Sequence, residues 1–219
     1  MALKAVLFDM DGVIVDTEPL HKKAYHQVFH DLQIDVTPEL YQSFTGSSTR
    51  KVCTVLKNHF DLSMHVDEIS SLKRMYFKEY FDTDPEFDLL PGVRELFESY
   101  RKEGITLVLA SSAAMNTINW VLEKFDIGSY FEAKVSGDEL AESKPNPEIF
   151  NIATTLSGKD KSECLVIEDS TNGILAAHRA GIFCAAYRSL HSTGQDYQLA
   201  NLVVDDLRKL KPEFLQSYF

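Results

Sequence analysis

Two acidic side chains, Asp9 and Asp11, follow a short apolar run near the start of the chain and are separated by one residue. Gly12 comes directly after them and allows a sharp turn, because glycine tolerates backbone conformations that other residues avoid. Carboxylates at this spacing beside a strand end can point into one crevice, where mutual repulsion raises a pKa. A divalent cation relieves the repulsion, and Mg²⁺ prefers oxygen ligands. Read alone, the segment also fits an ordinary acidic turn.

Three later segments supply side chains that would complement this acid pair. Ser111 and Ser112 end an apolar run, Glu168 and Asp169 end another, and Lys144 opens a proline-rich segment that leads into a helical pattern. Each has an ordinary interpretation by itself, namely a helix N-cap serine, an acidic turn and a surface lysine. Together they offer a nucleophilic carboxylate, metal ligands, a hydroxyl and an ammonium group. That combination is typical of phosphoryl transfer through an aspartyl-phosphate.

Short apolar runs predict the strands that would position these residues, at 4–8, 105–110, 133–136, 163–168, 182–187 and 201–204. Runs that are apolar throughout suit strands buried on both faces of a parallel sheet. Amphipathic patterns between them predict helices at about 92–103, 114–126, 146–157, 171–181 and 206–217. The alternation predicts an α/β fold built on a Rossmann-like, doubly wound parallel sheet.

One interval interrupts this alternation, because only helical patterns occur between Asp16 and about Pro85. We expect an inserted all-helical cap domain at 17–84, joined to a Rossmann-like catalytic core formed by 1–16 and 85–219. Open α/β sheets bind ligands beyond the carboxyl ends of their strands, so an insert at this point would cover the site.

Composition excludes several classes of partner. The chain has 219 residues, of which 44% are hydrophobic, and a net charge of −11, which argues against nucleic acid and anionic membranes. No apolar run approaches the roughly 18 residues of a membrane helix, and no signal peptide is visible. The three cysteines are widely spaced and form no CxxC pair, which suits free thiols in a reducing compartment. We therefore expect a cytoplasmic protein.

The segments DMDGV, LAS, SKPNP and IEDS resemble, in order, the four sequence motifs of the haloacid dehalogenase (HAD) superfamily. The helical interval after the first motif resembles the small helical cap of that superfamily. Within it, the chain is most similar to the beta-phosphoglucomutase-like phosphatase subgroup. The resemblance covers the whole chain and implies Mg²⁺-dependent hydrolysis of a small phosphomonoester, such as a sugar phosphate, by a monomer.

The resemblance also implies residue roles. Asp9 would attack the substrate phosphorus, and Asp11 would protonate the leaving oxygen and then help to deprotonate water. The implied phosphate-binding residues are Ser111, Ser112 and Lys144, and the implied metal ligands are Asp9, Asp11, Glu168 and Asp169. The dehalogenase branch of the superfamily uses no metal and lacks the second aspartate, so Asp11 argues against dehalogenation.

Substrate choice is expected to depend on the helical interval, through His21, Gly46 and Arg50. His21 matches a histidine that couples cap closure to catalysis in the mutase pattern, and Arg50 could bind a second phosphate or a carboxylate. The mutase pattern has an arginine where this chain has Thr49, and a shift of one helix position turns a side chain by about 100°.

This departure favours a phosphatase. The alternative is a beta-phosphoglucomutase that interconverts beta-glucose 1-phosphate and glucose 6-phosphate. A catalytically silent relative on the same fold is a further alternative, against which the complete set of motif residues argues.

Overall fold

The computed structural model describes residues 2–44, 49–189 and 194–219. The chain divides into two compact units: an α/β unit formed by Met1–Asp16 with Asp88–Phe219, and a helical unit formed by Thr17–Phe87. Within the described ranges, every helix is too short or too polar to cross a bilayer.

A six-stranded sheet forms the centre of the α/β unit, in the order β3-β2-β1-β4-β5-β6. All its neighbouring pairs are parallel. The strands are β1 (Ala5–Phe8), β2 (Thr106–Ser111), β3 (Phe131–Ser136), β4 (Cys164–Glu168), β5 (Phe183–Tyr187) and β6 (Leu202–Val204). The predicted α/β class with a doubly wound parallel sheet is therefore confirmed.

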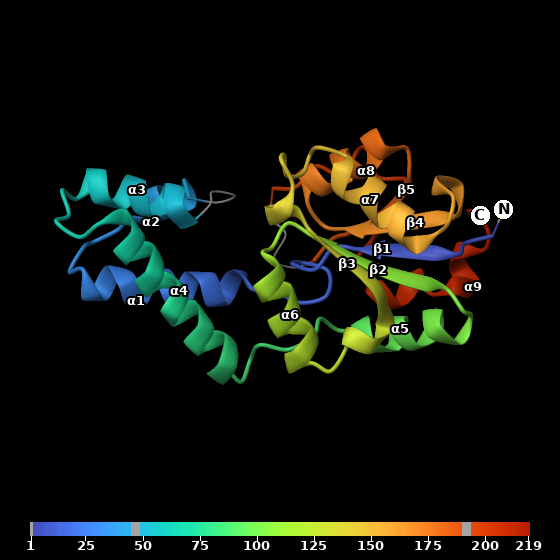
Figure 1. The fold of residues 1–219 in the computed structure, drawn as a ribbon, viewed down its shortest axis with the longest axis horizontal. Helices are drawn as coiled ribbons and strands as arrows, with labels where there is room; N and C mark the ends of the chain where they lie inside the picture. Colours follow the sequence, from blue (N-terminus) through green and yellow to red (C-terminus); the bar gives the residue numbers. More distant parts are fainter. Residues whose placement is uncertain (1, 45–48, 190–193) are drawn as a thin grey trace. The chain divides into compact units, whose positions relative to one another are not determined.

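Helices α7 and α8 lie on one face of this sheet and helices α5 and α9 on the other (Figure 1). The helices of the unit are α5 (Val93–Lys102), α6 (Met115–Lys124), α7 (Glu148–Ser157), α8 (Thr171–Ala180) and α9 (Pro212–Leu215). Short 3₁₀ turns are η1 (Gly128–Tyr130), η2 (Gly137–Glu139), η3 (Lys161–Glu163) and η4 (Leu207–Leu210). Coverage on both faces explains why β1 and β4 are buried along their whole length.

Aromatic rings fill one side of the core of the α/β unit. Phe8 of β1 meets Phe97 and Tyr100 of α5 and Phe131 of β3 edge to face, a geometry that aromatic quadrupoles favour. The buried hydroxyl of Tyr100 donates a hydrogen bond to the carbonyl of Leu210 at 2.5 Å, which satisfies the one polar atom of that ring. The packing holds β1, the strand that leads to Asp9, in a fixed position.

The predicted helix at 206–217 is the element that the structure corrects. The segment forms the 3₁₀ turn η4 and the four-residue α9, with Lys211 between them in an extended conformation. Pro212 has no backbone N–H and disfavours a helical conformation at the residue before it, so one continuous helix cannot form.

The helical unit contains α1 (Glu18–Asp31), α2 (Pro38–Gln42), α3 (Thr49–His59) and α4 (Val66–Thr83). Helix α1 packs along α4, and α3 also contacts α4. The buried side chains of this unit include Tyr25, Phe29, Val52, Leu56 and Ile69. Helices α1, α3 and α4 coincide with three helical patterns of this interval, EPLHKKAYHQVFHDL, STRKVCTVLKNHF and HVDEISSLKRMYFKEYF. The five-residue α2 begins at Pro38 after an N-cap by Thr37 and is too short for periodicity to reveal.

Candidate active site

The carboxyl ends of three adjacent strands deliver polar side chains to one edge of the sheet. Asp9 directly follows β1, Ser111 is the last residue of β2, and Glu168 is the last residue of β4. Because β1 lies between β2 and β4, these strand ends are neighbours. Asp9 is only 6% exposed and Glu168 is almost fully buried, so the charges lie inside the unit rather than at its surface.

Lys144 places a buried cation between these acids. Its ammonium group donates to Oδ1 of Asp9 at 2.5 Å, to Oε1 of Glu168 at 2.7 Å and to the carbonyl of Ala110 at 3.0 Å. The same nitrogen lies 5.0 Å from the ring centre of Phe150, which adds a cation–π contact. An ammonium group has three hydrogens to donate, and all three find acceptors here.

Burial and charge shift the pKa values of this cluster. Burial raises the pKa of Asp9 well above its usual range; the Lys144 charge opposes that rise, while Glu168 and Asp169 add to it. Burial by itself lowers the pKa of Lys144. The charges and hydrogen bonds of Asp9 and Glu168 together outweigh burial, so the pKa lies above the ordinary lysine value. Lys144 is therefore a permanent cation at neutral pH, surrounded by more negative charge than it can neutralise.

The carboxylate of Glu168 is fixed at both of its oxygens. Oε1 accepts from Lys144, and Oε2 accepts from the backbone N–H groups of Asp169 (2.9 Å) and Ser170 (3.0 Å) and from the Ser170 hydroxyl (3.0 Å). Ser170 is also the N-cap of α8, since its hydroxyl oxygen accepts from the N–H of Gly173 at 3.1 Å. The start of α8 thus fixes Glu168, and Glu168 in turn holds Lys144.

Three carboxylates in this cluster have the spacing of a metal site. One oxygen each from Asp9, Glu168 and Asp169 lies within 4.8 Å of the others. Gly12, at φ +81°, leaves room for the third, because a Cβ atom there would lie 2.1 Å from Oδ2 of Asp169. An all-oxygen donor set with surplus negative charge fits a hard divalent cation such as Mg²⁺.

Asp11 lies in a tight turn two residues after Asp9. The carbonyl of Met10 accepts from the N–H groups of Ile14 (2.8 Å) and Val15 (3.1 Å), and the N–H of Gly12 donates to the carbonyl of Val15 at 2.7 Å. Asp11 is half-buried in this turn. The positive φ of Gly12 is what lets the chain reverse so close to the strand end.

The two serines after β2 differ in exposure. Ser111 is buried, and its Oγ accepts from the N–H of Ala113 at 3.1 Å, whereas Ser112 is exposed. The Ser136 hydroxyl, at the end of the neighbouring β3, donates to the carbonyl of Ala113 at 2.8 Å and steadies the same loop. A hydroxyl that accepts one hydrogen bond can still donate one, so Ser111 keeps a donor for a bound oxyanion.

In the helical unit, His21 of α1 pairs with a residue that sequence patterns did not single out, Lys73 of α4. Nζ of Lys73 lies 2.6 Å from Nδ1 of His21, and the His21 ring stacks on Phe77 at 4.4 Å between centres. An ammonium group only donates, so Nδ1 of His21 accepts and the ring carries its hydrogen on Nε2. Burial and then the Lys73 charge lower the pKa of His21 to about 3, which keeps the imidazole neutral.

Lys73 itself is only 3% exposed. Its ammonium group lies 5.1 Å from the ring centre of Tyr25 and 4.9 Å from that of Phe77. Burial lowers the pKa of Lys73 to about 8. The available signal in the sequence was its place four residues before Phe77 on the apolar side of α4, a position where a lysine is unusual.

The other two residues expected to select the substrate are less informative. Arg50 is exposed near the start of α3 and forms an ion pair with Asp67 of α4. Gly46 lies outside the described residues. The structure thus gathers Asp9, Lys144, Glu168 and Asp169 in the α/β unit, whereas His21 and Arg50 belong to the helical unit and have different partners.

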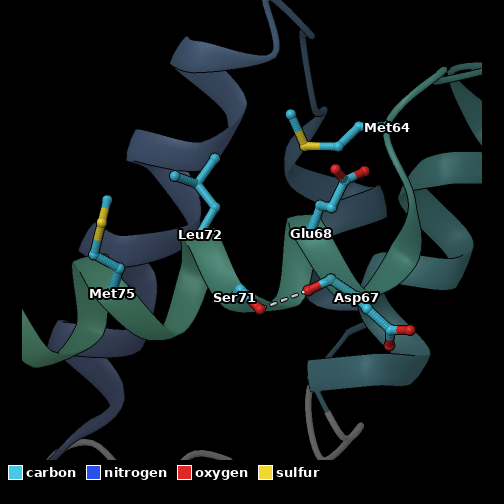
Figure 2. A pocket seen from close by; sticks show the side chains of 6 residues that line it. All are labelled: Met64, Asp67, Glu68, Ser71, Leu72 and Met75. Atoms are coloured by element: carbon cyan, nitrogen blue, oxygen red, sulfur yellow. Dashed lines mark hydrogen bonds between the residues drawn. The ribbon is translucent and has the colours of Figure 1, made fainter.

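A surface hollow of about 520 Å³ also lies in the helical unit, along α4 and the turn before it (Figure 2). It is lined by Met64, Asp67, Glu68, Ser71, Leu72 and Met75. The Ser71 hydroxyl donates to the backbone carbonyl of Asp67 at 2.7 Å and so serves the helix itself. No predicted catalytic residue lines this hollow, and we assign it no chemistry.

Comparison with known proteins gives consistent matches. The chain matches the haloacid dehalogenase-like hydrolase family over residues 6–187. It is 31% identical over 184 residues to a phosphorylated carbohydrates phosphatase of Thermotoga maritima, covering 82% of each chain. It is 28% identical over 214 residues to a phosphoglycolate phosphatase of Pseudomonas savastanoi, covering 95% of this chain and 79% of that one. The crystal structure of a beta-phosphoglucomutase from Clostridium difficile superposes with a TM-score of 0.76 at 28% identity, covering 98% of this chain and 96% of that chain.

Proposed function

The chain belongs to the haloacid dehalogenase-like hydrolase family, and we propose that it is a Mg²⁺-dependent phosphatase that hydrolyses a small phosphomonoester through a phosphorylated Asp9. The observation that carries the proposal is the buried Lys144, which joins Asp9 to Glu168 at the edge of three adjacent strands. A buried lysine between two acids, next to a third, suits a site that must receive a dianionic phosphoryl group.

In the first proposed step, Lys144 orients the Asp9 carboxylate through Oδ1, and the second oxygen attacks the substrate phosphorus. A bond forms from Asp9 to phosphorus, and the ester bond to the leaving alcohol breaks. Asp11 donates a proton to the departing oxygen. Ser111 donates a hydrogen bond to a phosphoryl oxygen, and the positive charge of Lys144 offsets the negative charge of the phosphoryl group. Ser112 lies on the exposed side of the same loop.

In the second step, Asp11 accepts a proton from a water molecule as that water attacks the phosphorus of phospho-Asp9. The bond between Asp9 and phosphorus breaks, inorganic phosphate leaves, and both aspartates return to their starting states. The same residue serves as acid and then as base, so it must be protonated before the first step and must sit beside the transferred group in both steps.

We infer that Asp9, Glu168 and Asp169, with the backbone carbonyl of Asp11, hold Mg²⁺. The support is the three-carboxylate set within 4.8 Å and its surplus of negative charge. When bound, the ion offsets charge on the phosphoryl oxygens and on the attacking carboxylate. Glu168 also has its two oxygens engaged by protein donors, so its contribution is to hold Lys144 as well as to add charge.

We assign the helical insert at 17–84 the role of a cap over the core formed by 1–16 and 85–219. A cap that closes would exclude bulk water during transfer and admit it for hydrolysis. The proposed substrate is a small phosphorylated metabolite. A sugar phosphate is favoured by the similarity to the phosphorylated carbohydrates phosphatase of Thermotoga maritima. We propose a cytoplasmic monomer that needs neither nucleic acid nor a membrane.

The test is phosphate release from a panel of sugar phosphates and short phosphorylated acids. We expect turnover with Mg²⁺ and a loss of at least about 100-fold when the metal is chelated. Restoring excess Mg²⁺ should return the rate, which controls for damage to the protein. Equal release with and without the metal would contradict the metal assignment, and no release from any phosphoester would contradict the phosphatase.

A second candidate is a beta-phosphoglucomutase, favoured by the similarity to that enzyme of Clostridium difficile. In that reaction phospho-Asp9 would return its phosphoryl group to a sugar hydroxyl rather than to water. Beta-glucose 1-phosphate supplied with Mg²⁺ separates the two, because a mutase forms glucose 6-phosphate and a phosphatase forms inorganic phosphate. Rapid isomerisation with negligible phosphate release would replace the first proposal by the second.

A further inference from the structure

Gly173 lies in the first turn of α8, and the space that its side chain would fill is occupied. A Cβ atom at this position would lie 1.7 Å from Oε1 of Glu168, 1.8 Å from Cδ and 2.3 Å from Oε2. These distances are far inside van der Waals contact. The Gly173 backbone is helical and the residue is buried, so its conformation does not itself require glycine.

The Glu168 carboxylate is not a loose side-chain end that can move aside. Its two oxygens accept hydrogen bonds from Lys144, from the N–H groups of Asp169 and Ser170, and from the Ser170 hydroxyl. A side chain at Gly173 would force Glu168 to give up several of these at once. The contact with Lys144 would change first, because Oε1, the oxygen that accepts from Lys144, is the nearest atom to the added Cβ.

We propose that Gly173 is a positioning residue: because it has no side chain, the Glu168 carboxylate can occupy the space beside it. Glu168 in turn holds the Lys144 ammonium group in contact with Asp9. The effect on turnover rests on the proposed phosphatase function, whereas the packing relation between Gly173 and Glu168 does not. The ordinary interpretation is that the helix merely tolerates glycine. That interpretation makes the opposite prediction for stability, because alanine is the better helix former.

The first measurement is the thermal unfolding of Gly173→Ala in the metal-free protein. We expect its Tm to fall by about 4 °C or more, as for overpacking of a buried site. Asn172→Ala is the matched control, because Asn172 is exposed in the same turn of α8. A Tm of Gly173→Ala at or above that of the wild type would overturn the proposal.

The second measurement repeats Gly173→Ala in a Glu168→Ala background, where the collision partner is gone. In that background we expect Gly173→Ala to leave the Tm unchanged or to raise it. The Tm changes caused by Gly173→Ala and Glu168→Ala should therefore be strongly non-additive. An equal loss in both backgrounds would assign the cost to the helix and would overturn the proposal. If Gly173→Ala alone gives no soluble protein while Glu168→Ala alone does, recovery in the double variant supports the proposal, and failure of the double variant overturns it.

The third measurement is turnover of folded Gly173→Ala well below its Tm, with the substrate that the wild type hydrolyses best. We expect kcat to fall about 10- to 100-fold, because small displacements of a catalytic group are costly, while Asn172→Ala keeps the wild-type value. If the Tm effects of Gly173→Ala and Glu168→Ala are non-additive but kcat of Gly173→Ala is unchanged, the proposed effect of Gly173 on Lys144 is overturned. If the wild type hydrolyses nothing, the phosphatase proposal fails, and the Tm cycle still decides the relation between Gly173 and Glu168.

Discussion

Lys144 and Lys73 are both buried lysines, one in each unit of the chain, yet their pKa values shift in opposite directions. The Lys144 side chain is 5% exposed and touches Asp9 and Glu168. Lys73 is 3% exposed and touches neutral His21 and the faces of two aromatic rings. Burial lowers the pKa in both cases, but the two acids reverse the shift at Lys144, whereas Lys73 is left with a pKa of about 8.

The difference shows that partners, not burial, decide whether an interior lysine is a permanent cation. In the α/β unit the charge of Lys144 is secured by carboxylates, as the proposed phosphoryl-transfer site would need. In the helical unit Lys73 touches an imidazole and two aromatic rings, which are weaker partners, and the favourable charge of Glu18 does not outweigh burial. Lys73 is therefore the lysine that can lose its proton near physiological pH.

Removing Lys144 should have the largest effect on activity. Lys144→Met keeps an apolar stem of similar length but leaves Asp9 and Glu168 without their shared cation. We expect phosphate release to fall by at least about 100-fold. Lys134→Met is the control, since Lys134 is exposed on β3 and bonds Asn119. Activity of Lys144→Met within a few-fold of wild type would break the contrast between the two lysines.

Removing Lys73 should act on stability and on its pH dependence. The folded-state pKa of about 8 lies below the value of 10.5 for an unperturbed lysine, so the unfolded chain binds more protons between these values. The free energy of unfolding of the wild type should therefore rise with pH across that window. Lys73→Met should be the more stable protein near neutral pH, by roughly 1–4 kcal/mol, and should lack that rise.

Denaturant unfolding at about pH 7 and about pH 9.5 tests this prediction. The quantity to compare is the difference in free energy of unfolding between Lys73→Met and the wild type, because contributions from other titrating groups cancel in it. The difference should narrow as the pH rises. Parallel pH dependences for the two proteins would show that Lys73 does not titrate as the structure indicates.

The exposed ion pair of Arg50 and Asp67 should have the smallest effect. Both side chains are largely in water, so a double-mutant cycle of Arg50→Ala and Asp67→Ala should give a coupling of about 0.2–1 kcal/mol in the free energy of unfolding. If Arg50 also binds substrate, as we expect, Arg50→Ala should raise KM several-fold and Asp67→Ala should not. A coupling above about 2 kcal/mol would mean that surface ion pairs here behave like buried ones.

The sequence predicted the sheet well, because the central strands β1, β2 and β4 are buried along nearly their whole length and therefore form short apolar runs of strand length. All six strands fall within two residues of their predicted ranges. The predicted helix at 206–217 was wrong, since a single proline outweighs an amphipathic pattern. The sequence also indicated that acids at separate strand ends would meet, and Asp9, Glu168 and Asp169 do lie together. Their catalytic roles stay predictions.

Other features of the site depend on packing that residue types do not reveal. Lys73 was not foreseen, because a lysine in a helix is normally assigned to the solvent side. Both oxygens of Glu168 accept hydrogen bonds, and its carboxylate fills the space beside Gly173. Both features depend on how the start of α8 packs beside the end of β4, which residue types alone do not reveal. Gly46 lies outside the described residues, so the substrate-selecting role expected for it stays a prediction.

The central claim is that Asp9 carries the phosphoryl group during turnover. Its most direct test is mass spectrometry of peptides from enzyme quenched in acid while it turns over substrate. We predict one added phosphoryl group on the peptide that contains Asp9, and neither the adduct nor phosphate release in Asp9→Asn and Asp9→Ala. A phosphoryl group on another side chain, or turnover retained by either variant, would contradict the account.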